Sequence, residues 1–394
     1  MPHQRISNSI LLPELNLKNV ERLNRWEKKL HCEKYSEMEV CPKCATPSKT
    51  IYDHREVKIK DAPIRHYRVI LKIKKRRFLC KTCKKPFTEP VQGILPRRKT
   101  TQRFRTHVYW ACENFSSLTR VKRAVRCSNH FIYSALYEKL ELNRRMKQNP
   151  WPHTIGIDEH SFLRKNRYKK HSFVTMIVDY KNNRLKEVVN GKTGTDLCES
   201  LKNIEGRENV KKAVIDMCDP YRSFIKDFFP NAEIIADKFH VLRLLNPTLN
   251  KMRTSITGDK RKHPARWLLL TNQKRLEPWE RGALLKWLEQ YPELMEVYQY
   301  KEALSRFYRI RGYHKASRIL IKLTDQMALS KLKEIQTLRK TLLRWKQEVL
   351  NYFKFRVTNA KTEGYNNVAK VIKRMAYGFR SFKNYRLRLL NACC

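Results

Sequence analysis

The pattern of hydrophobic and polar positions changes along the chain, and each change predicts a different kind of element. In residues 68–78, Val69, Leu71 and Ile73 alternate with polar residues, and this period of two predicts a β-strand. From about residue 99 to 146, apolar positions recur at helical spacing and charged residues fill the other positions. The chain is therefore expected to begin with a β-rich segment that is followed by a small helical bundle.

Short apolar runs separated by polar turns follow Trp151 and Pro152. We expect strands at 154–158, 172–179, 185–189, 214–216 and 232–237, and helices at 197–204, at 220–228 and from 241 onwards. This order of three strands, helix, strand, helix, strand and helix resembles an RNase-H-like fold. In that fold the first and fourth strands are neighbours, so Asp158 and Asp216 are expected to lie side by side.

Residues 246–356 show no strand pattern, and their leucines and tryptophans recur as in amphipathic helices. This all-helical segment separates the fifth strand from a helix that carries Glu363. Two interpretations are open, because the segment could hold DNA over the site or could serve as a packing or dimerisation domain. Before Glu363, a strand-like run begins at residue 355, and Thr358 or Asn359 is placed to cap the helix.

The composition of the chain indicates what kind of partner it binds. The 394 residues contain 85 Lys and Arg against 37 Asp and Glu, a formal net charge of +48, and this charge is spread along the chain. Such a footprint indicates a nucleic acid as the partner. Double-stranded DNA is the nucleic acid expected from the motifs that follow. No apolar run approaches the roughly 20 residues that span a bilayer, and the N-terminus lacks the apolar core of a signal peptide. We therefore expect no membrane association and a cytoplasmic, nucleoid-associated protein.

Four of the 11 cysteines have the spacing of a metal site. Two residues separate Cys41 from Cys44, and two separate Cys80 from Cys83, so each pair can chelate one edge of a tetrahedron. Together they predict a structural four-cysteine zinc site, joined by hairpin strands as in a zinc ribbon. A thioredoxin-like redox pair is disfavoured because the motif occurs twice.

Residues 117–142 have the proportions of a helix-turn-helix, with a polar break at residues 127–129 and Ser128 or Asn129 as the cap of the second helix. A purely structural hairpin remains the alternative. In the DNA-binding interpretation, four basic residues of the first helix contact phosphates, and four residues of the second helix face the major groove. These residues are Arg120, Lys122, Arg123 and Arg126, and then His130, Tyr133, Ser134 and Tyr137.

Three widely spaced carboxylates, Asp158, Asp216 and Glu363, suggest a catalytic two-metal site. Two carboxylates at adjacent strand ends repel one another, and hard divalent cations offset that repulsion. Two Mg²⁺ ions, for which Mn²⁺ can substitute, would then support in-line displacement at phosphorus. Asp219 and Asp237 are rivals for the second position, and Asp216 is preferred because it ends an apolar strand.

At these residues the chain resembles the ISL3 family of bacterial insertion-sequence transposases. The likeness rests on four stretches, which are the cysteine pairs with residues 76–89, residues 155–159, residues 216–221 with 237–241, and residues 358–367. The resemblance implies a DDE transposase in which Asp158, Asp216 and Glu363 form the metal-binding triad. A family position often occupied by glycine is Ala360 here.

The expected fold is thus a multi-domain α/β protein with an N-terminal zinc ribbon, a helix-turn-helix and an RNase-H-like catalytic core interrupted by an all-helical insertion. The expected domains are residues 1–98, 99–150, 151–245, 246–356 and 357–394. The expected function is to bind the terminal inverted repeats of an insertion sequence, cleave them and transfer the strands. A catalytically inactive, transposase-derived DNA-binding regulator is the alternative. Synapsis of two DNA ends argues for at least a homodimer.

Overall fold

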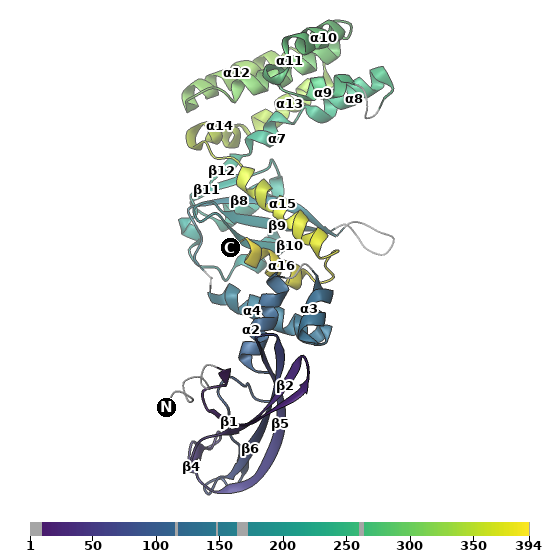
Figure 1. Cartoon of the computed structure of the whole chain (residues 1–394). Coiled ribbons are helices and arrows are strands. Elements are labelled where there is room, and N and C mark those ends of the chain that lie inside the picture. Colours follow the sequence, from purple (N-terminus) through teal and green to yellow (C-terminus); the bar gives the residue numbers. More distant parts are fainter. Residues whose placement is uncertain (1–9, 115–116, 147–148, 164–171, 260–263, 394) are drawn as a thin grey trace. The chain divides into compact units, whose positions relative to one another are not determined.

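The computed structural model describes residues 10–114, 117–146, 149–163, 172–259 and 264–393. The chain divides into two compact units, residues 1–145 and 146–394 (Figure 1). The two units are described separately below.

The first unit opens with a five-stranded sheet in which β1, β2, β6 and β5 are hydrogen-bonded in that order and β7 pairs with β6. Its strands are β1 (Leu15–Asn24), β2 (Glu27–Lys34), β5 (Ile51–Ile64), β6 (Tyr67–Leu79) and β7 (Pro86–Thr88). The predicted alternation is confirmed in β6, where Val69, Leu71 and Ile73 are buried. The short strands β3 (Glu39–Val40) and β4 (Pro47–Ser48) form a separate hairpin.

The described part of the first unit also contains the helices α2 (Gln102–Asn114), α3 (Leu118–Val125) and α4 (Asn129–Met146). They share one apolar cluster that includes Phe104, Val121 and Ile132. Ser117 caps α3 and Ser128 caps α4, since their hydroxyls accept hydrogen bonds from the backbone of Arg120 and Phe131. The break between α3 and α4 contains Arg126 in the left-handed conformation, with φ 45°.

The second unit is built on another five-stranded sheet, in the order β10, β9, β8, β11, β12. Its strands are β8 (Thr154–Leu163), β9 (Ser172–Asp179), β10 (Arg184–Asn190), β11 (Lys212–Ile215) and β12 (Glu233–Ala236). Strands β8, β9 and β10 are antiparallel neighbours, whereas β11 is parallel to both β8 and β12. The first and fourth strands of this unit are therefore hydrogen-bonded neighbours.

Side chains of β8 alternate between the two faces of this sheet. On one face lie α15 (Ala360–Met375) and α16 (Phe382–Ala392), and Figure 1 shows α15 running obliquely across the strands. The ring of Phe162 on β8 packs against Phe382 and Tyr385 of α16. On the other face lie α5 (Gly194–Leu201) and α6 (Asp219–Phe228), where the hydroxyl of Tyr221 lies 3.0 Å from that of Thr175 on β9.

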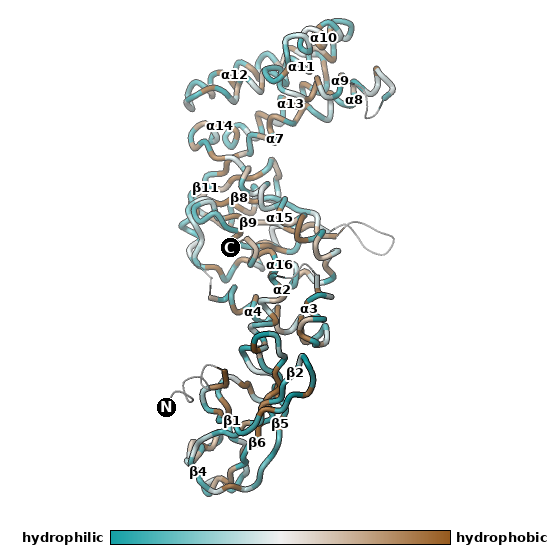
Figure 2. Tube along the Cα trace, in the orientation of Figure 1, coloured by the Kyte–Doolittle hydropathy of each residue, from teal (hydrophilic) through white to brown (hydrophobic). Residues whose placement is uncertain are grey.

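Between β12 and α15 the described residues form helices. They are α7 (Lys238–Leu242), α8 (Asn246–Thr257), α9 (Pro264–Leu270), α10 (Pro278–Leu288), α11 (Pro292–Phe307), α12 (Tyr313–Ala328), α13 (Lys333–Arg344) and α14 (Lys346–Phe355). Figure 2 shows hydrophobic and hydrophilic stretches mixed along α12, as expected for an amphipathic helix with one buried side. The chain returns to the sheet at α14, where the amide of Asn351 donates to the carbonyl of Ile234 on β12.

One sequence prediction near this return is wrong. The strand-like run at residue 355 is not a strand, because Phe355 ends α14 and the next residues connect directly to α15. Its apolar residues are instead half-buried against the common core of the sheet and the helices. Among the described residues, no helix is both long and apolar enough to cross a membrane.

Candidate functional site

The four cysteines of the first unit meet at one point. Cys41 and Cys44 lie in the turn between β3 and β4, and Cys80 and Cys83 lie in the turn between β6 and β7. The sulfur atoms of Cys44 and Cys80 are 3.4 Å apart, and those of Cys41 and Cys83 are 3.6 Å apart. Sulfur atoms bound at about 2.3 Å to one tetrahedral zinc ion would be about 3.8 Å apart, so the cluster fits zinc.

Both cysteine pairs have the same backbone shape. The residue after each pair, Ala45 or Lys84, has a positive φ (55° and 50°), which turns the chain back around the sulfur atoms. Next to the cluster, the rings of Phe78 and Phe87 are stacked with centroids 5.9 Å apart. These features support a structural zinc ion in a zinc ribbon.

The second candidate site lies where β8 and β11 run side by side. Asp158 is on β8, and Asp216 directly follows the end of β11. Burial, and then the negative charge of Asp216 together with a hydrogen bond between the two side chains, raise the pKa of Asp158 to about 7. The structure thus brings two of the three predicted carboxylates into direct electrostatic contact.

Helix α15 supplies the neighbour of Asp158. The side-chain amide of Asn366 donates to the Asp158 carboxylate at 2.6 Å. The other end of that amide, Asn366 Oδ1, is buried and accepts no hydrogen bond from the described residues. Two hydrogen bonds hold the start of α15 in place, both with a length of 2.9 Å. The Tyr180 hydroxyl donates to the Thr358 carbonyl, and the Lys361 ammonium donates to the Tyr180 carbonyl.

This close approach of α15 depends on Gly156 of β8. A Cβ atom at residue 156 would lie 2.4 Å from Thr362 Oγ1 and 2.6 Å from the Tyr180 side chain. Real Cβ contacts are longer, so any larger residue would force α15 away from the strand. Gly156 therefore allows Asn366 to reach Asp158.

We expect Gly156→Ala to destabilise the protein by about 1–3 kcal/mol, because overpacking must displace α15. The hydrogen bond between Asn366 and Asp158 should be lost with it. Gly364→Ala is the matched control, since a Cβ at residue 364 meets no atom within 4 Å and alanine favours a helix. Calorimetric melting should show a lower transition temperature for Gly156→Ala and an equal or higher one for Gly364→Ala. Equal melting of both variants would contradict tight docking of α15.

Asp216 is also held by a second cluster. His240 Nδ1 lies 2.8 Å from Asp216 and 3.3 Å from Asp237. Hydrogen bonds to Asp216 and then Asp237 raise the pKa of His240 to about 10, so its imidazole is protonated at neutral pH. Asp216, Asp237 and His240 offer three potential ligand atoms close together. The protonated imidazole donates to both carboxylates, so a metal held by all three residues would have to displace that proton.

Asp237 is already fully engaged by the protein. It caps α7 by accepting from the Phe239 backbone at 3.1 Å, and it accepts from the Asn359 backbone at 2.8 Å. Burial alone would raise its pKa, but the hydrogen bond from His240 and that backbone bond outweigh burial and lower it. This buried carboxylate therefore connects α7 to the start of α15.

The other predicted carboxylates lie outside this cluster. Glu363 is in the first turn of α15, one turn before Asn366, and its side chain is exposed. Asp219 is at the start of α6 and forms an ion pair with Arg344 at 2.6 Å. Asn359 is the N-cap residue of α15, but its side chain is directed to the Ile157 carbonyl and Asp216, at 3.4 and 3.5 Å, instead of capping the helix.

The candidate DNA contacts of the first unit are mostly exposed. Arg120, Lys122, Arg123 and Arg126 are exposed on and after α3, as are His130 and Tyr133 on α4. Tyr137 is half-buried, with its ring stacked against that of Tyr133 at 6.1 Å. Ser134 is used internally, because its hydroxyl accepts from Arg105 at 3.0 Å and donates to Glu138 at 3.1 Å.

Two family profiles match this chain. Residues 155–389 match the family profile described as transposase, of the ISL3 type, and residues 37–83 match the zinc-finger of transposases IS204, IS1001, IS1096 and IS1165. The chain belongs to the ISL3 family of transposases. It is 23% identical over 366 residues to the transposase of insertion sequence element IS1001 from Bordetella parapertussis, which covers 89% of this chain and 87% of that protein.

A second relative matches only a short segment. An ATP-dependent protease from Lactococcus lactis is 40% identical over 55 residues, which is 14% of this chain and 18% of that protein. So short a segment gives no support for protease activity in this family member.

Sequence reasoning did not assign a role to His240 or to Tyr180. A signal for His240 was present, because Asp237 and His240 are three residues apart and such residues are neighbours at the start of a helix. Tyr180 had no such signal, since its contacts are with residues almost 180 positions away.

Proposed function

We propose that this transposase binds the terminal inverted repeats of its own element, cleaves DNA there by metal-dependent phosphoryl transfer, and joins the ends to target DNA. The observation that carries the proposal is the pairing of Asp158 and Asp216 at adjacent strands, beneath the helix that bears Glu363. Family membership supports a nuclease or transferase activity in general. The geometry supports the particular chemistry.

We also propose the domain assignment expected from the sequence. The sheet order β10, β9, β8, β11, β12 is that of an RNase-H-like core, with residues 246–356 as a helical insertion and residues 357–394 as its closing segment. Helices α3 and α4 form the helix-turn-helix within residues 99–150, after a ribbon domain over residues 1–98. The exposed basic side chains of α3 and the exposed residues His130 and Tyr133 of α4 support this assignment.

The carboxylates fit a hard divalent cation. Asp158 and Asp216 lie beside the buried Asn366 Oδ1, which has no hydrogen-bond partner among the described residues, and together they form an oxygen-rich site suited to Mg²⁺. Asp158, Asp216 and Glu363 are the proposed ligands, with Mn²⁺ as a substitute metal. Two such ions would supply charge stabilisation at the attacking and leaving oxygens.

Other residues of the chain orient this triad. Asn366 fixes one oxygen of Asp158, while His240 and Asn359 both donate to Asp216. These contacts limit the rotation of both carboxylates before substrate arrives, which favours rapid chemistry. Because two DNA ends must meet, we propose that the active assembly contains at least two copies of the chain.

Metal affinity is expected to rise with pH. With a pKa of about 7, Asp158 is mostly protonated at pH 6 and mostly ionised at pH 8, so Mn²⁺ affinity should increase about tenfold across that range. Calorimetric titration of Mn²⁺ at both pH values measures this increase. Asp158→Asn should remove it, and Asp219→Asn should retain it. A pH-independent affinity in the wild type would contradict the raised pKa of Asp158 as the cause.

The same groups set the stability of the metal-free protein. The raised pKa of Asp158 means that its stabilising contribution is present below about pH 4 and is lost as pH rises through about 7. For His240 the contribution is present below about pH 6.5 and is lost as pH rises through about 10. Each of these two contributions should therefore fall as pH rises through its window.

A catalytically inactive DNA-binding regulator is the second candidate function. The exposed position of Glu363, outside the cluster around Asp216, favours it. Incubation of the protein with Mg²⁺ and a DNA fragment that carries the element's own ends separates the two functions. Cleavage and strand transfer support the transposase. Tight binding without cleavage in either Mg²⁺ or Mn²⁺ supports the regulator.

A further inference from the structure

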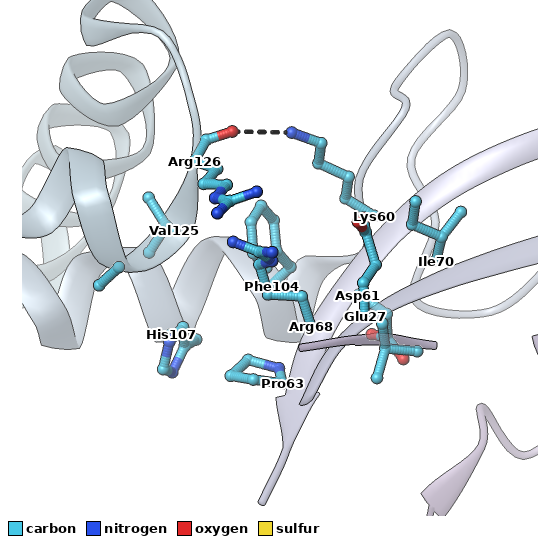
Figure 3. A pocket seen from close by; sticks show the side chains of 12 residues that line it. Glu27, Lys60, Asp61, Pro63, Arg68, Ile70, Phe104, His107, Val125 and Arg126 are labelled. Carbon is cyan, nitrogen blue, oxygen red and sulfur yellow. Dashed lines mark hydrogen bonds between the residues drawn. The ribbon is translucent and has the colours of Figure 1, made fainter. Parts of the chain in front are cut away.

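A cavity lies within the first unit, where α2 and α3 meet the sheet (Figure 3). Its walls come from β2, β5, β6, α2 and α3, and its volume is about 70 Å³. That space holds roughly five water-sized groups, enough for one phosphate. The zinc cluster and the carboxylates described above do not line it.

Arg68 of β6 is the unusual residue in this wall. Its Nε and Nη2 atoms are buried, and in the described part of the chain neither has a hydrogen-bond partner. Arg68 as a whole is half-buried, but an arginine side chain cannot release its proton, so buried guanidinium nitrogens without partners are costly. Glu27 of β2 is opposite Arg68 in the strand pairing, yet no ion pair joins the two among the described residues.

Further positive charge surrounds the same space. Figure 3 shows Arg68, Lys60 and Arg126 lining the cavity near the ring of Phe104, and Lys60 donates to the Arg126 carbonyl at 3.0 Å. Since backbone carbonyls carry no formal charge, this bond positions the Lys60 ammonium without neutralising it.

The acidic residues of the wall offset only part of this charge. The Asp61 carboxylate is already paired with the Arg103 guanidinium, and it also accepts from Thr101 at 2.7 Å. Glu27 is the one remaining carboxylate among the lining residues, against three cations. Burial lowers the pKa of His107, so its imidazole adds no charge at neutral pH. The cavity is thus a net cationic pocket with unsatisfied donors.

We propose that this cavity binds one phosphate group, and that the phosphate belongs to the backbone of DNA held by α3 and α4. The location supports this source, because Arg126 is both in the cavity wall and in the turn that leads into α4. A guanidinium fork is the donor that best matches a phosphate. The assignment of this phosphate to DNA rests on the proposed DNA-binding role of α3 and α4. The proposal that the cavity binds a phosphate group does not.

The test compares full-length wild type with Arg68→Met. Methionine keeps an unbranched apolar stem like that of arginine but lacks the guanidinium. Binding to a fragment with the element's inverted repeat is measured by fluorescence anisotropy at several salt concentrations. Arg68→Met should weaken binding about tenfold or more, and should reduce the slope of log affinity against log salt by about 0.9. Lys58→Met is the matched control, since Lys58 is an exposed cation of β5 outside the cavity, and it should change affinity less than about twofold.

A second arm locates the phosphate. Each backbone phosphate of the inverted repeat is replaced singly by a neutral methylphosphonate. One position should weaken wild-type binding as much as Arg68→Met does, and should have no further effect on that variant. If no position behaves in this way, and Arg68→Met and Lys58→Met lose equal DNA affinity, the phosphate does not come from DNA.

A third arm tests the pocket without DNA. Inorganic phosphate should raise the melting temperature of the wild type above that in chloride of equal ionic strength, and should not do so in Arg68→Met. This result without DNA binding by the wild type would keep the pocket while contradicting the proposed function.

Glu27→Gln tests the alternative that Arg68 simply forms an ion pair with Glu27. If the cavity binds phosphate, removal of the opposing carboxylate should strengthen phosphate and DNA binding. If the variant instead lowers the melting temperature and leaves both affinities unchanged, Arg68 pairs with Glu27 and the proposal is overturned.

Discussion

Asp216→Asn is expected to reduce DNA cleavage and strand transfer by at least about 1,000-fold, while binding to the element's ends stays within about twofold. Asparagine keeps the size of the side chain but removes the charge that would hold a divalent cation. Asp158 cannot compensate alone, because a single carboxylate offers a divalent cation half of the negative charge that the pair provides. DNA binding is assigned to the first unit and to basic residues, so it should not depend on this carboxylate. Cleavage of labelled ends in Mg²⁺, with binding measured in Ca²⁺, gives both values.

Two other aspartates serve as controls for this result. Asp219→Asn should leave cleavage within about twofold, since Asp219 is a partly exposed group whose ion pair with Arg344 is worth little. Asp237→Asn should lower the melting temperature, because it weakens the cap of α7 and the tie to Asn359. Full activity of Asp216→Asn, together with loss of activity in a folded Asp219→Asn, would transfer the catalytic role to Asp219.

Cys80→Ser is expected to abolish zinc binding and to unfold the ribbon. Structural zinc contributes about 10–16 kcal/mol of apparent binding free energy near neutral pH, which is as large as the whole stability of a typical domain. Cys80 is fully buried and its sulfur lies 3.4 Å from that of Cys44, so no other group can take its place. Specific binding to the element's ends should fall to the level of non-specific DNA. Metal analysis should show one zinc ion per wild-type chain and none in the variant.

The control for this prediction is Cys112→Ser. Cys112 is half-buried on α2, outside the four-cysteine cluster, so this variant should retain zinc and specific binding. Chelation of zinc from the wild type should reproduce the effect of Cys80→Ser on the ribbon, with no change in the melting of the second unit. Retention of zinc by Cys80→Ser would show that the four cysteines do not share one ion.

The cysteine site was predictable because its signal is local. Two Cys-x-x-Cys pairs need only a hairpin between them to meet, and the alternating pattern of β6 predicted that hairpin. By contrast, β1 and β2 were not predicted, because few of their residues alternate cleanly. In β1 only Leu15 is buried, and most of the strand is exposed. Its place in the sheet follows from pairing with β2, which no local pattern specifies.

The carboxylate site was predictable in part. The element order of residues 154–242 placed Asp158 and Asp216 on neighbouring strands, and the structure has β8 paired with β11. The engagement of Asp237 by Asn359, and the role of Gly156, could not be predicted in this way. Both depend on how α15 docks after more than 100 intervening residues, and the sequence contains no measure of that docking.

The sequence by itself determined the family, the zinc ligands, most of the helical segments, the strands of the second unit and the basic character of the chain. Each of these follows from short-range periodicity, fixed ligand spacing or summed charge. Only the tertiary structure decided which polar groups are already satisfied. It shows Asp237 engaged by α7 and α15, His240 protonated between two carboxylates, and two buried Arg68 nitrogens with no partner in the described part of the chain. Those states depend on burial and on contacts between distant segments, which arise only when the chain has folded.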